Sequence, residues 1–379
     1  MPKPLNIRWA TWWPVPYWTD RFDVLAQHPQ VKLKIFFLHG QSKLLPYEAQ
    51  EAAWQFDYQF LSRKPTDAGY SQRIRLNIPN FLPLILGSFD ALVMNYADSS
   101  TVSAAFAAMM MGKDYIIFSP NTLMDMRHPS KLKESLKKIL FQRALAVFVT
   151  GPLQKDYALQ YQPDERQIYS IGNPVKDMSS MFKGSREDLR RDYGWRDELI
   201  ILYVGRFSRE KGLEQLLQST KFLQDSGLNI KLVMVGDGEC LADLKKLQAE
   251  LGIDVFFAGF HEGEKLQAFY AMADIFALPS LSEPWGLVVN EAMQFGLPIV
   301  ISDKVGAKPS LLEEGKNGYS FPVGDIKALS QKLEKLARDP VLRQNMGQYA
   351  KEHIQNHSIE AWCEAVVGAI NQALAERKS

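Results

Sequence analysis

The chain alternates between short continuous apolar runs and longer segments in which apolar residues recur every three or four positions. A short apolar run predicts a buried strand, and the three-to-four spacing predicts a helix with one buried face. Residues 199–204, LIILYV, followed by the helical pattern at 213–224, form one such pair. Repeated alternation of this kind predicts an α/β protein whose parallel sheets are covered by helices on both faces.

The first half follows this alternation with one interruption. Residues 40–80 have little periodicity and many aromatic side chains, including Trp54 and Phe60. A long irregular segment inside a domain is often functional, so contact with a substrate and packing on the domain's own flank both stay open. The remaining pattern predicts strands at 5–12, 31–38, 89–94, 115–118, 146–150 and 167–171 and helices at 19–27, 100–111, 129–145 and 152–161.

The second half alternates without interruption. A polar segment that begins at Asn173-Pro174 precedes it and is typical of a domain boundary. Two domains are also expected because 379 residues exceed what one ordinary core accommodates. The pattern predicts strands at 199–204, 231–235, 254–257, 273–278, 299–301 and 319–322 and helices at 213–224, 264–271, 286–295, 325–338, 340–355 and 358–376.

Composition and charge narrow the class of protein. The hydrophobic content of 46% is that of a globular protein, and the net charge of +1 does not indicate a nucleic-acid binder. The two cysteines, Cys240 and Cys363, form no disulfide framework or zinc pattern, which favours the cytoplasm. Pro14 and Pro16 interrupt the first apolar run, so no signal peptide is expected there, and the longest apolar stretches are too short to cross a bilayer.

One stretch combines a strand, a polar loop and a helix start: LPSLSEPWGLVVNEAMQFGLPIV, residues 278–300. Ligands bind outside the carboxyl ends of strands in such units, and the free N–H groups near Gly286 and Leu287 form an anion site. Glu283 in the loop and Glu291 in the helix could each accept hydrogen bonds from sugar hydroxyls. A solvated loop glutamate and an ordinary first-turn glutamate are the alternative for these two carboxylates alone.

A second loop, GRFSREKG at residues 205–212, follows the buried strand 199–204. Gly205 allows a close turn of the backbone. Arg206 and Lys211 would then lie between a strand end and a helix start, where their charges suit the oxygens of a diphosphate. Ordinary surface charge is the alternative, and it becomes less attractive because the loop precedes the two-glutamate motif in the chain.

The motifs E-x7-E and G-R-x4-K-G together resemble those of glycosyltransferase family 4, the group 1 retaining enzymes that use nucleotide sugars. This resemblance implies the GT-B fold, in which two Rossmann-like domains with parallel sheets face a cleft. It implies an acceptor-side domain at 1–172 and a nucleotide-sugar donor domain at 173–357. The helix of 358–379 would then cross back onto the first domain.

The resemblance also implies an activity: retaining, metal-independent transfer of a sugar from a nucleoside-diphosphate sugar to an acceptor hydroxyl. No cofactor beyond this co-substrate is expected, and UDP is favoured over GDP as its nucleotide. An epimerase or phosphorylase of the same fold, or a non-catalytic nucleotide-sugar-binding protein, is the alternative. Arg206, Lys211 and Glu283 are the implied catalytic residues, and Gly205, Arg206, Lys211, Phe260, Glu283, Gly286, Leu287 and Glu291 the implied donor-binding ones.

The first half departs from the family pattern at two places. Trp13-Pro14 stands where many members have a glycine-rich loop, and Asn121 stands where many have a histidine. Asn121 can bind a sugar hydroxyl but cannot act as a base, and His128 nearby is expected to face solvent. We expect Trp13, Trp18 and Asn121 to lie on the acceptor side, the acceptor being a sugar, a lipid-linked sugar or a small molecule.

The helix expected at 129–145 is basic and amphipathic. Such a helix can lie on an anionic membrane or form a solvated face over the core. Peripheral contact with the inner face of the membrane is therefore one expectation for this cytoplasmic protein. The basic residues are Lys131, Lys133, Lys137 and Lys138.

Overall fold

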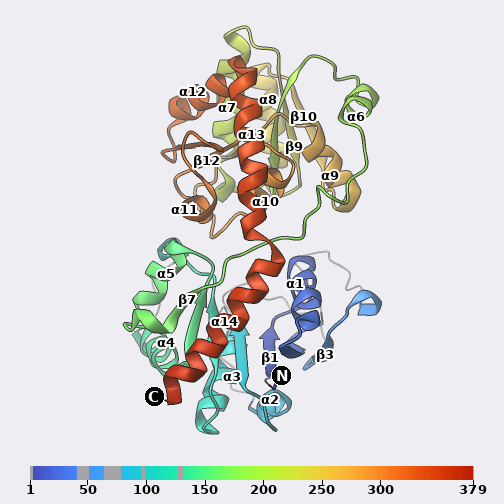
Figure 1. The fold of residues 1–379 in the computed structure, drawn as a ribbon. Helices are drawn as coiled ribbons and strands as arrows, with labels where there is room; N and C mark the ends of the chain where they lie inside the picture. The colour runs from blue at the N-terminus through green and yellow to red at the C-terminus, as the bar shows by residue number, and fades with distance from the viewer. Residues whose placement is uncertain (1–2, 41–50, 64–77, 96–98, 126–130, 379) are drawn as a thin grey trace. The chain divides into compact units, whose positions relative to one another are not determined.

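The structure is a computed structural model that describes residues 3–40, 51–63, 78–95, 99–125 and 131–378. Contacts divide the chain into two compact units (Figure 1). Unit 1 comprises residues 1–176 together with 359–379, and unit 2 comprises residues 177–358. The chain therefore passes from one unit to the other twice.

Unit 1 is built on one parallel sheet of seven strands in the order β3-β2-β1-β4-β5-β6-β7. The strands are β1 (Leu5–Thr11), β2 (Val31–Phe37), β3 (Asp57–Phe60), β4 (Ala91–Asn95), β5 (Ile116–Ser119), β6 (Ala146–Val149) and β7 (Ile168–Ser170). The helices are α1 (Pro16–Gln27), α2 (Ile78–Ile85), α3 (Ser99–Met110), α4 (Lys131–Arg143), α5 (Pro152–Leu159) and α14 (Ile359–Lys378), with 3-10 turns η1 (Glu51–Ala53), η2 (Leu123–Asp125) and η3 (Glu165–Gln167).

Unit 2 is built on a second parallel sheet, of six strands in the order β10-β9-β8-β11-β12-β13. The strands are β8 (Leu199–Val204), β9 (Ile230–Val235), β10 (Val255–Gly259), β11 (Ile275–Leu278), β12 (Ile299–Ser302) and β13 (Gly318–Phe321). The helices are α6 (Arg186–Asp192), α7 (Leu213–Asp225), α8 (Leu241–Leu251), α9 (Gly263–Met272), α10 (Leu287–Gln294), α11 (Lys308–Leu311), α12 (Ile326–Arg338) and α13 (Pro340–Ile354), with 3-10 turns η4 (Arg209–Lys211) and η5 (Gln355–His357).

The prediction of two parallel, helix-covered sheets is confirmed. All residues of β9, β11 and β12 are buried, because strands with helices on both faces have no solvent side. Each sheet reverses its strand order once, between β1 and β4 in unit 1 and between β8 and β11 in unit 2. These reversals are the positions at which ligands bind to sheets of this type.

Several elements differ from the sequence-based expectation. β3 lies in the segment 40–80, which was expected to be irregular, and α2 begins at its end. β3 is a four-residue edge strand with no fully buried residue, and α2 is short and contains Pro83, so neither carries a clear periodic signal. Helix α1 begins at Pro16 rather than Thr19, since proline is favoured in the first turn. α6 was not predicted, because none of its residues is buried and it shows no apolar face.

The aromatic side chains of the segment 51–60 pack on one another at the edge of the first sheet. Trp54 stacks on Phe56 with ring centroids 5.4 Å apart, and both approach Phe37 of β2. Tyr58 meets Trp54 edge-on at 4.8 Å. Of the two alternatives for these aromatics, the structure therefore supports packing on the flank of the domain. Tyr47 and Tyr70 lie outside the described residues.

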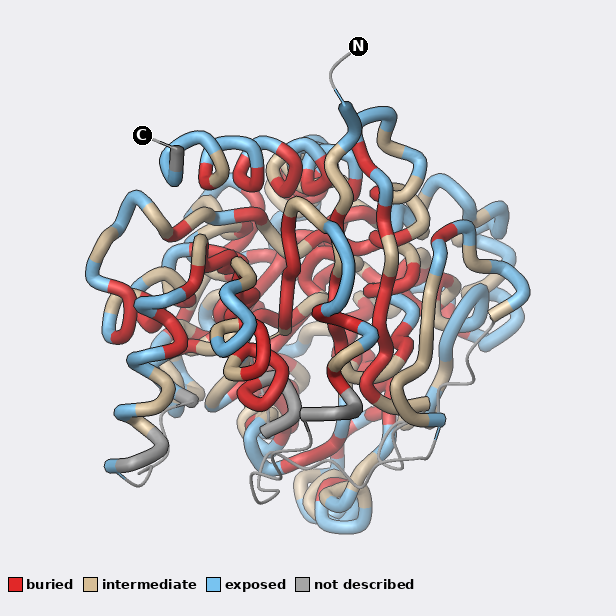
Figure 2. Tube along the Cα trace, turned by 90° about the horizontal axis from the view of Figure 1, so that it is seen from below, coloured by how far each residue is buried: buried red, intermediate tan, exposed pale blue. Residues whose placement is uncertain are grey.

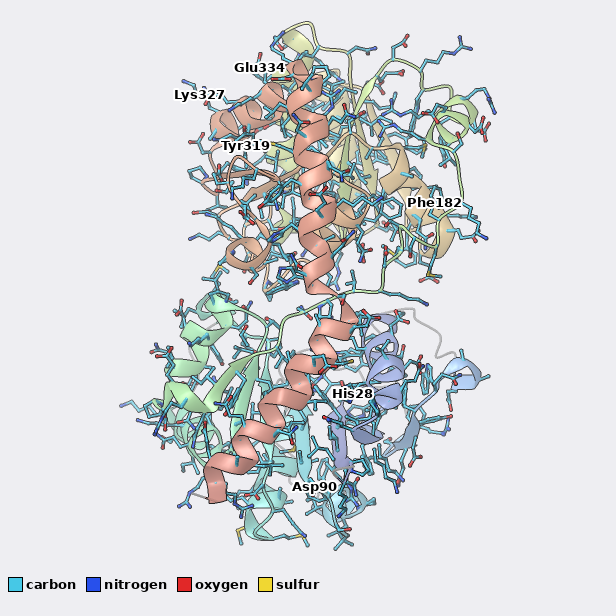
Figure 3. All side chains as sticks on the ribbon, viewed as in Figure 1. His28, Asp90, Phe182, Tyr319, Lys327 and Glu334 are labelled. Carbon is cyan, nitrogen blue, oxygen red and sulfur yellow. The ribbon has the colours of Figure 1, made fainter. Side chains whose placement is uncertain are left out.

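The last helix, α14, belongs to the core of unit 1. Its buried side lies on the rest of the unit (Figure 2). Trp362 packs against Trp9 of β1 at a centroid distance of 5.6 Å. Near the end of α1, His28 Nε2 lies 3.2 Å from Glu364 Oε1 (Figure 3). The chain's final helix thus completes a core that its first strand begins.

A buried arginine fixes the segment that leaves unit 1. The Arg21 guanidinium donates hydrogen bonds from Nε and Nη2 to the Pro174 carbonyl at 3.0 and 2.6 Å, and its plane lies over the Trp18 ring. Burial lowers the pKa of Arg21 to about 10, so the side chain remains charged near neutral pH.

Candidate functional site

The predicted donor residues gather at the carboxyl edge of the unit 2 sheet. All its strands are parallel, so the loops that follow β8, β11 and β12 leave the same edge. β11 lies between β8 and β12 in the sheet. The loop 205–212 follows β8 and the loop 279–286 follows β11, so both predicted motifs lie at the point where strand order reverses.

Three hydrogen bonds hold the loop 205–212 to β8, to β9 and to the segment that follows β9. The Gly205 N–H donates to the Val235 carbonyl at 3.0 Å, and the Phe207 N–H donates to the Asp237 carbonyl at 2.8 Å. The Tyr203 hydroxyl of β8 donates to the Arg206 carbonyl at 2.9 Å. Burial raises the pKa of Tyr203 well above its usual value, and nearby carboxylates raise it further. Tyr203 therefore stays protonated and remains a donor to the loop near neutral pH.

The two motif loops are joined directly to each other. The Leu281 N–H donates to the Glu210 carbonyl at 2.8 Å. Lys211 Nζ lies 2.5 Å from Glu283 Oε2, and the two side chains are only 18% and 14% exposed. This ion pair brings a predicted phosphate-binding residue and a predicted sugar-binding residue to one place.

Two backbone hydrogen bonds join the loop 279–286 to the segment that follows β12. The Gly306 N–H donates to the Glu283 carbonyl at 2.8 Å, and the Ala307 N–H donates to the Trp285 carbonyl at 3.0 Å. A side chain at Gly306 would not fit, because its Cβ would lie 1.8 Å from the Pro284 oxygen. Glu283 is thus held between two loops before any ligand arrives.

Helix α10 presents its start to this loop. Gly286 precedes the helix with φ of 92°, a left-handed conformation that glycine adopts without strain. The Leu287 and Val288 N–H groups at the helix start have no acceptor within the helix, whereas the Val289 N–H donates to the Gly286 carbonyl at 2.9 Å. Arg206 is exposed in the neighbouring loop. The helix start, Arg206 and Lys211 together form a positively charged group of donors suited to a diphosphate.

Glu291 lies on the second turn of α10 and is half-buried. The Tyr270 hydroxyl of α9 donates to Glu291 Oε2 at 2.6 Å. Burial raises the pKa of Glu291, and the Tyr270 hydrogen bond opposes that rise. The predicted ribose-binding carboxylate therefore has one oxygen already held by the protein.

Phe260 follows β10 at the same edge of the sheet and is 52% exposed. β10 is two strand positions from β8, about 10 Å at the usual strand spacing. The contact of the backbone near Phe260 with a nucleobase stays a prediction.

The predicted acceptor-side residues of unit 1 lie in different environments. Trp18 is 6% exposed and packs in the core between Phe22 and Phe118, so we assign it to packing. Trp13 and Asn121 are half-buried and follow β1 and β5, at the carboxyl edge of their sheet. His128 lies outside the described residues.

Two buried hydroxyls at this edge were not singled out in the sequence. Ser119 ends β5 and Thr150 follows β6, and neither side-chain oxygen has a hydrogen-bond partner among the described residues. Each hydroxyl could bond to a ligand that reaches this edge.

The basic helix α4 presents only part of its charge outward. Lys131 and Lys138 are exposed, as is Ile139. Lys137 instead donates to the hydroxyls of Tyr157 and Tyr161 at 2.9 and 3.1 Å, so it does not belong to the outer face. The Lys133 side chain is outside the described part of the structure.

Three site features were missed by sequence reasoning: Tyr203 under the phosphate loop, Tyr270 behind Glu291, and the close approach at Gly306. Tyr203 and Tyr270 lie within apolar runs and resemble core residues there. Gly306 gave a weak signal as a glycine in the loop after β12. Their roles depend on contacts between segments far apart in the chain.

Among the described residues, no group of three or more His, Cys, Asp or Glu side chains is placed to hold a metal ion. None of the described helices is long and apolar enough to cross a membrane.

Comparison with known proteins places part of the chain in a family. Residues 185–353 match the family described as glycosyl transferases group 1. The chain is 28% identical to the sulfoquinovosyl transferase of Arabidopsis thaliana over 81% of its own length and 60% of that protein. It is 28% identical to the alpha-D-kanosaminyltransferase of Streptomyces kanamyceticus over 70% of its length and 69% of that protein.

Solved structures share the fold. HepE of Anabaena, solved in complex with UDP, superposes with a TM-score of 0.77 at 16% identity, covering 97% of this chain and 100% of that one. At this identity the likeness establishes the arrangement of strands and helices and leaves the chemistry to be argued from the residues.

Proposed function

This chain belongs to the group 1 glycosyl transferases, and from that premise we propose that it transfers a sugar from a nucleoside-diphosphate sugar to an acceptor hydroxyl, with retention of configuration and without a metal ion. The observation that carries the proposal is the Lys211–Glu283 ion pair, 2.5 Å long, at the strand-order reversal of unit 2. It joins the two motif loops into one site.

The positive groups at this edge lie where the reaction would develop negative charge. When the bond between the sugar and the diphosphate breaks, negative charge develops on the departing phosphate. Lys211 and the start of α10 are donors that the fold holds in place, and the exposed Arg206 adds a second cation; together they would stabilise that charge. Retention is proposed because a leaving phosphate on the same face can take the acceptor's proton, so no side chain has to serve as the base.

The carboxylates would orient the donor. Glu283 would accept hydrogen bonds from hydroxyls of the transferred sugar, and Glu291 would accept them from the ribose. Gly205, Gly286 and Leu287 would offer backbone N–H groups to the diphosphate, and the backbone near Phe260 would contact the base. Trp13 and Asn121 would contribute to acceptor binding in unit 1.

UDP is the proposed nucleotide. The proposal draws support from HepE of Anabaena, a protein of the same fold that was solved with UDP. A thermal-shift screen with UDP, GDP, ADP and dTDP tests it, and we expect UDP to raise the melting temperature most.

The mechanism predicts that transfer continues in excess EDTA and that an α-linked donor yields an α-linked product. Proton NMR of the product measures the anomeric configuration, and nucleotide release measures turnover. A β-linked product from that donor would reject retention, and loss of turnover on chelation that returns with added Mg²⁺ would reject metal independence. Donor binding without nucleotide release in the presence of acceptors would favour a non-catalytic binder.

We also propose that this chain binds the cytoplasmic face of a membrane through α4 and meets its acceptor at that surface. The exposed residues Lys131, Lys138 and Ile139 combine positive charge with an apolar side chain, and Met110, at the end of the adjacent α3, is 68% exposed. Basic residues near an anionic surface contribute about 1 kcal/mol each.

Charge reversal tests this surface. Lys131→Glu with Lys138→Glu should reduce binding to phosphatidylglycerol-containing vesicles at least about tenfold, as measured by co-sedimentation. The matched control reverses Lys245 and Lys246, an exposed pair on α8. Equal loss of vesicle binding in both variants would mean that net charge alone causes the effect. Absence of vesicle binding by wild type would reject membrane contact.

A further inference from the structure

Tyr270 is held rigidly behind the site. It is fully buried near the end of α9, and its ring stacks on Phe295 with centroids 5.5 Å apart and an interplanar angle of 16°. Phe276 of β11 contacts the same ring at 6.2 Å. Phe295 is in turn contacted by Phe182, on the segment that leads into α6 (Figure 3). With its ring enclosed by aromatics, Tyr270 has little freedom to move its hydroxyl.

That hydroxyl meets the carboxylate of Glu291, at 2.6 Å from Oε2. Among the described residues, the Glu291 side chain makes this hydrogen bond and no other. An ionised carboxylate has about four acceptor positions, so the contact with Tyr270 leaves capacity for a ligand. Glu291 is half-buried, so part of it remains accessible.

We propose that Tyr270 is a positioning residue of the nucleotide site, whose hydroxyl fixes the Glu291 carboxylate in the orientation that binds the ribose hydroxyls. The inference rests on the proposed function, in which Glu291 is the ribose ligand. Without the hydroxyl, the carboxylate could rotate, and its buried oxygen would lose its donor. Nucleotide affinity would fall although Tyr270 does not touch the nucleotide.

The electrostatics make the proposal distinguishable from simple packing. Burial raises the pKa of Glu291, and the Tyr270 hydrogen bond opposes that effect. Burial, and next the Glu291 charge, raise the pKa of Tyr270 well above its usual value, so Tyr270 remains a donor. Removing the hydroxyl therefore leaves the burial of Glu291 unopposed, and protonation should occur at higher pH.

Other ionisable groups on the elements around Glu291 are exposed, as Glu352 of α13 is, or engaged elsewhere. β11 and β12 carry none. On α9, Glu264 and Lys265 are exposed in the first turn. On α13, Arg343 bonds to the Leu336 carbonyl, Tyr349 and His353 contact Glu313, and Lys351 lies beside Gly296, beyond the end of α10.

The test compares Tyr270→Phe with wild type by calorimetric titration of the nucleoside diphosphate that most stabilises wild type, among UDP, GDP, ADP and dTDP. We expect affinity at neutral pH to fall about three- to tenfold, the usual effect of one hydrogen bond. We also expect the acid side of the affinity–pH profile to shift to higher pH. Phenylalanine keeps the ring contacts, so the fold should persist, as a melting curve would verify.

Tyr319→Phe is the matched control, since Tyr319 is 6% exposed and contacts Lys332 and Lys335 rather than a site residue. It should leave affinity and profile unchanged. Glu291→Gln distinguishes a failure of the ribose role of Glu291 from a failure of the positioning role of Tyr270. If it binds nucleotide normally, or if no nucleotide binds wild type, the ribose role and this inference both fail. If Glu291→Gln binds weakly but Tyr270→Phe matches wild type in affinity and profile, the positioning role alone is wrong.

Discussion

Replacing Lys211 by alanine should reduce kcat/KM for the nucleotide-sugar donor about ten- to a hundredfold, because one charge-assisted contact contributes about 1.5–3 kcal/mol. Arg206→Ala should have an effect of the same order. Steady-state assays of nucleotide release would measure both. The matched control is Arg209→Ala, which removes an exposed charge from the same loop and should change kcat/KM little. Normal donor turnover by both the Lys211 and Arg206 variants would show that the diphosphate binds elsewhere.

The Lys211–Glu283 ion pair predicts that substitutions at its two positions have coupled effects on stability. Both side chains are largely buried, so removing either one leaves its partner's charge without compensation. The double variant Lys211→Gln with Glu283→Gln should therefore lose less stability than the sum of the two single variants. Melting curves of the four proteins measure this coupling. Additive losses would mean that the two residues act independently.

Gly306→Ala should damage the site and the fold together. The added Cβ would lie 1.8 Å from the Pro284 oxygen, so the loop 279–286 must move away from the segment that follows β12. Overpacking of this kind costs about 1–3 kcal/mol. Displacement of Glu283, whose carbonyl accepts from the Gly306 N–H, should also lower donor affinity.

Gly368→Ala is the comparison for this variant. Gly368 lies in α14, and a Cβ there would meet no atom within 4 Å. Alanine is favoured over glycine in a helix by about 1 kcal/mol, so the melting temperature should hold or rise. A Gly306→Ala protein with wild-type melting temperature and donor affinity would show that the two loops separate freely.

The sequence predicted the sheets and both motif loops because these depend on local pattern. Continuous apolar runs such as 199–204 identify fully buried strands, and Gly286 followed by helical spacing identifies the start of α10. The spacing of the motifs could also be recognised without knowing the fold. What brings Lys211 next to Glu283 is the order of β8 and β11 in the sheet, and no local pattern contains that order.

The missed features share this dependence on distant contacts. Tyr270 has the surroundings of a core residue in its own helix, and its role arises only from α10. Trp18 illustrates the opposite error: a tryptophan in an aromatic loop suggested ligand contact, whereas the folded chain buries it against Phe22 and Phe118. β3 escaped detection because an exposed edge strand needs no apolar run.

The division of unit 1 between both ends of the chain has a consequence for synthesis. Residues 177–358 are continuous, so unit 2 has its complete core as soon as they emerge from the ribosome. Unit 1 begins earlier in the chain, but its core lacks Trp362 and the rest of α14 until the residues after unit 2 have also been made. We expect the later half to reach its native state earlier. Until α14 packs on unit 1, the apolar face that it covers stays exposed, and exposed apolar surface of this kind favours aggregation.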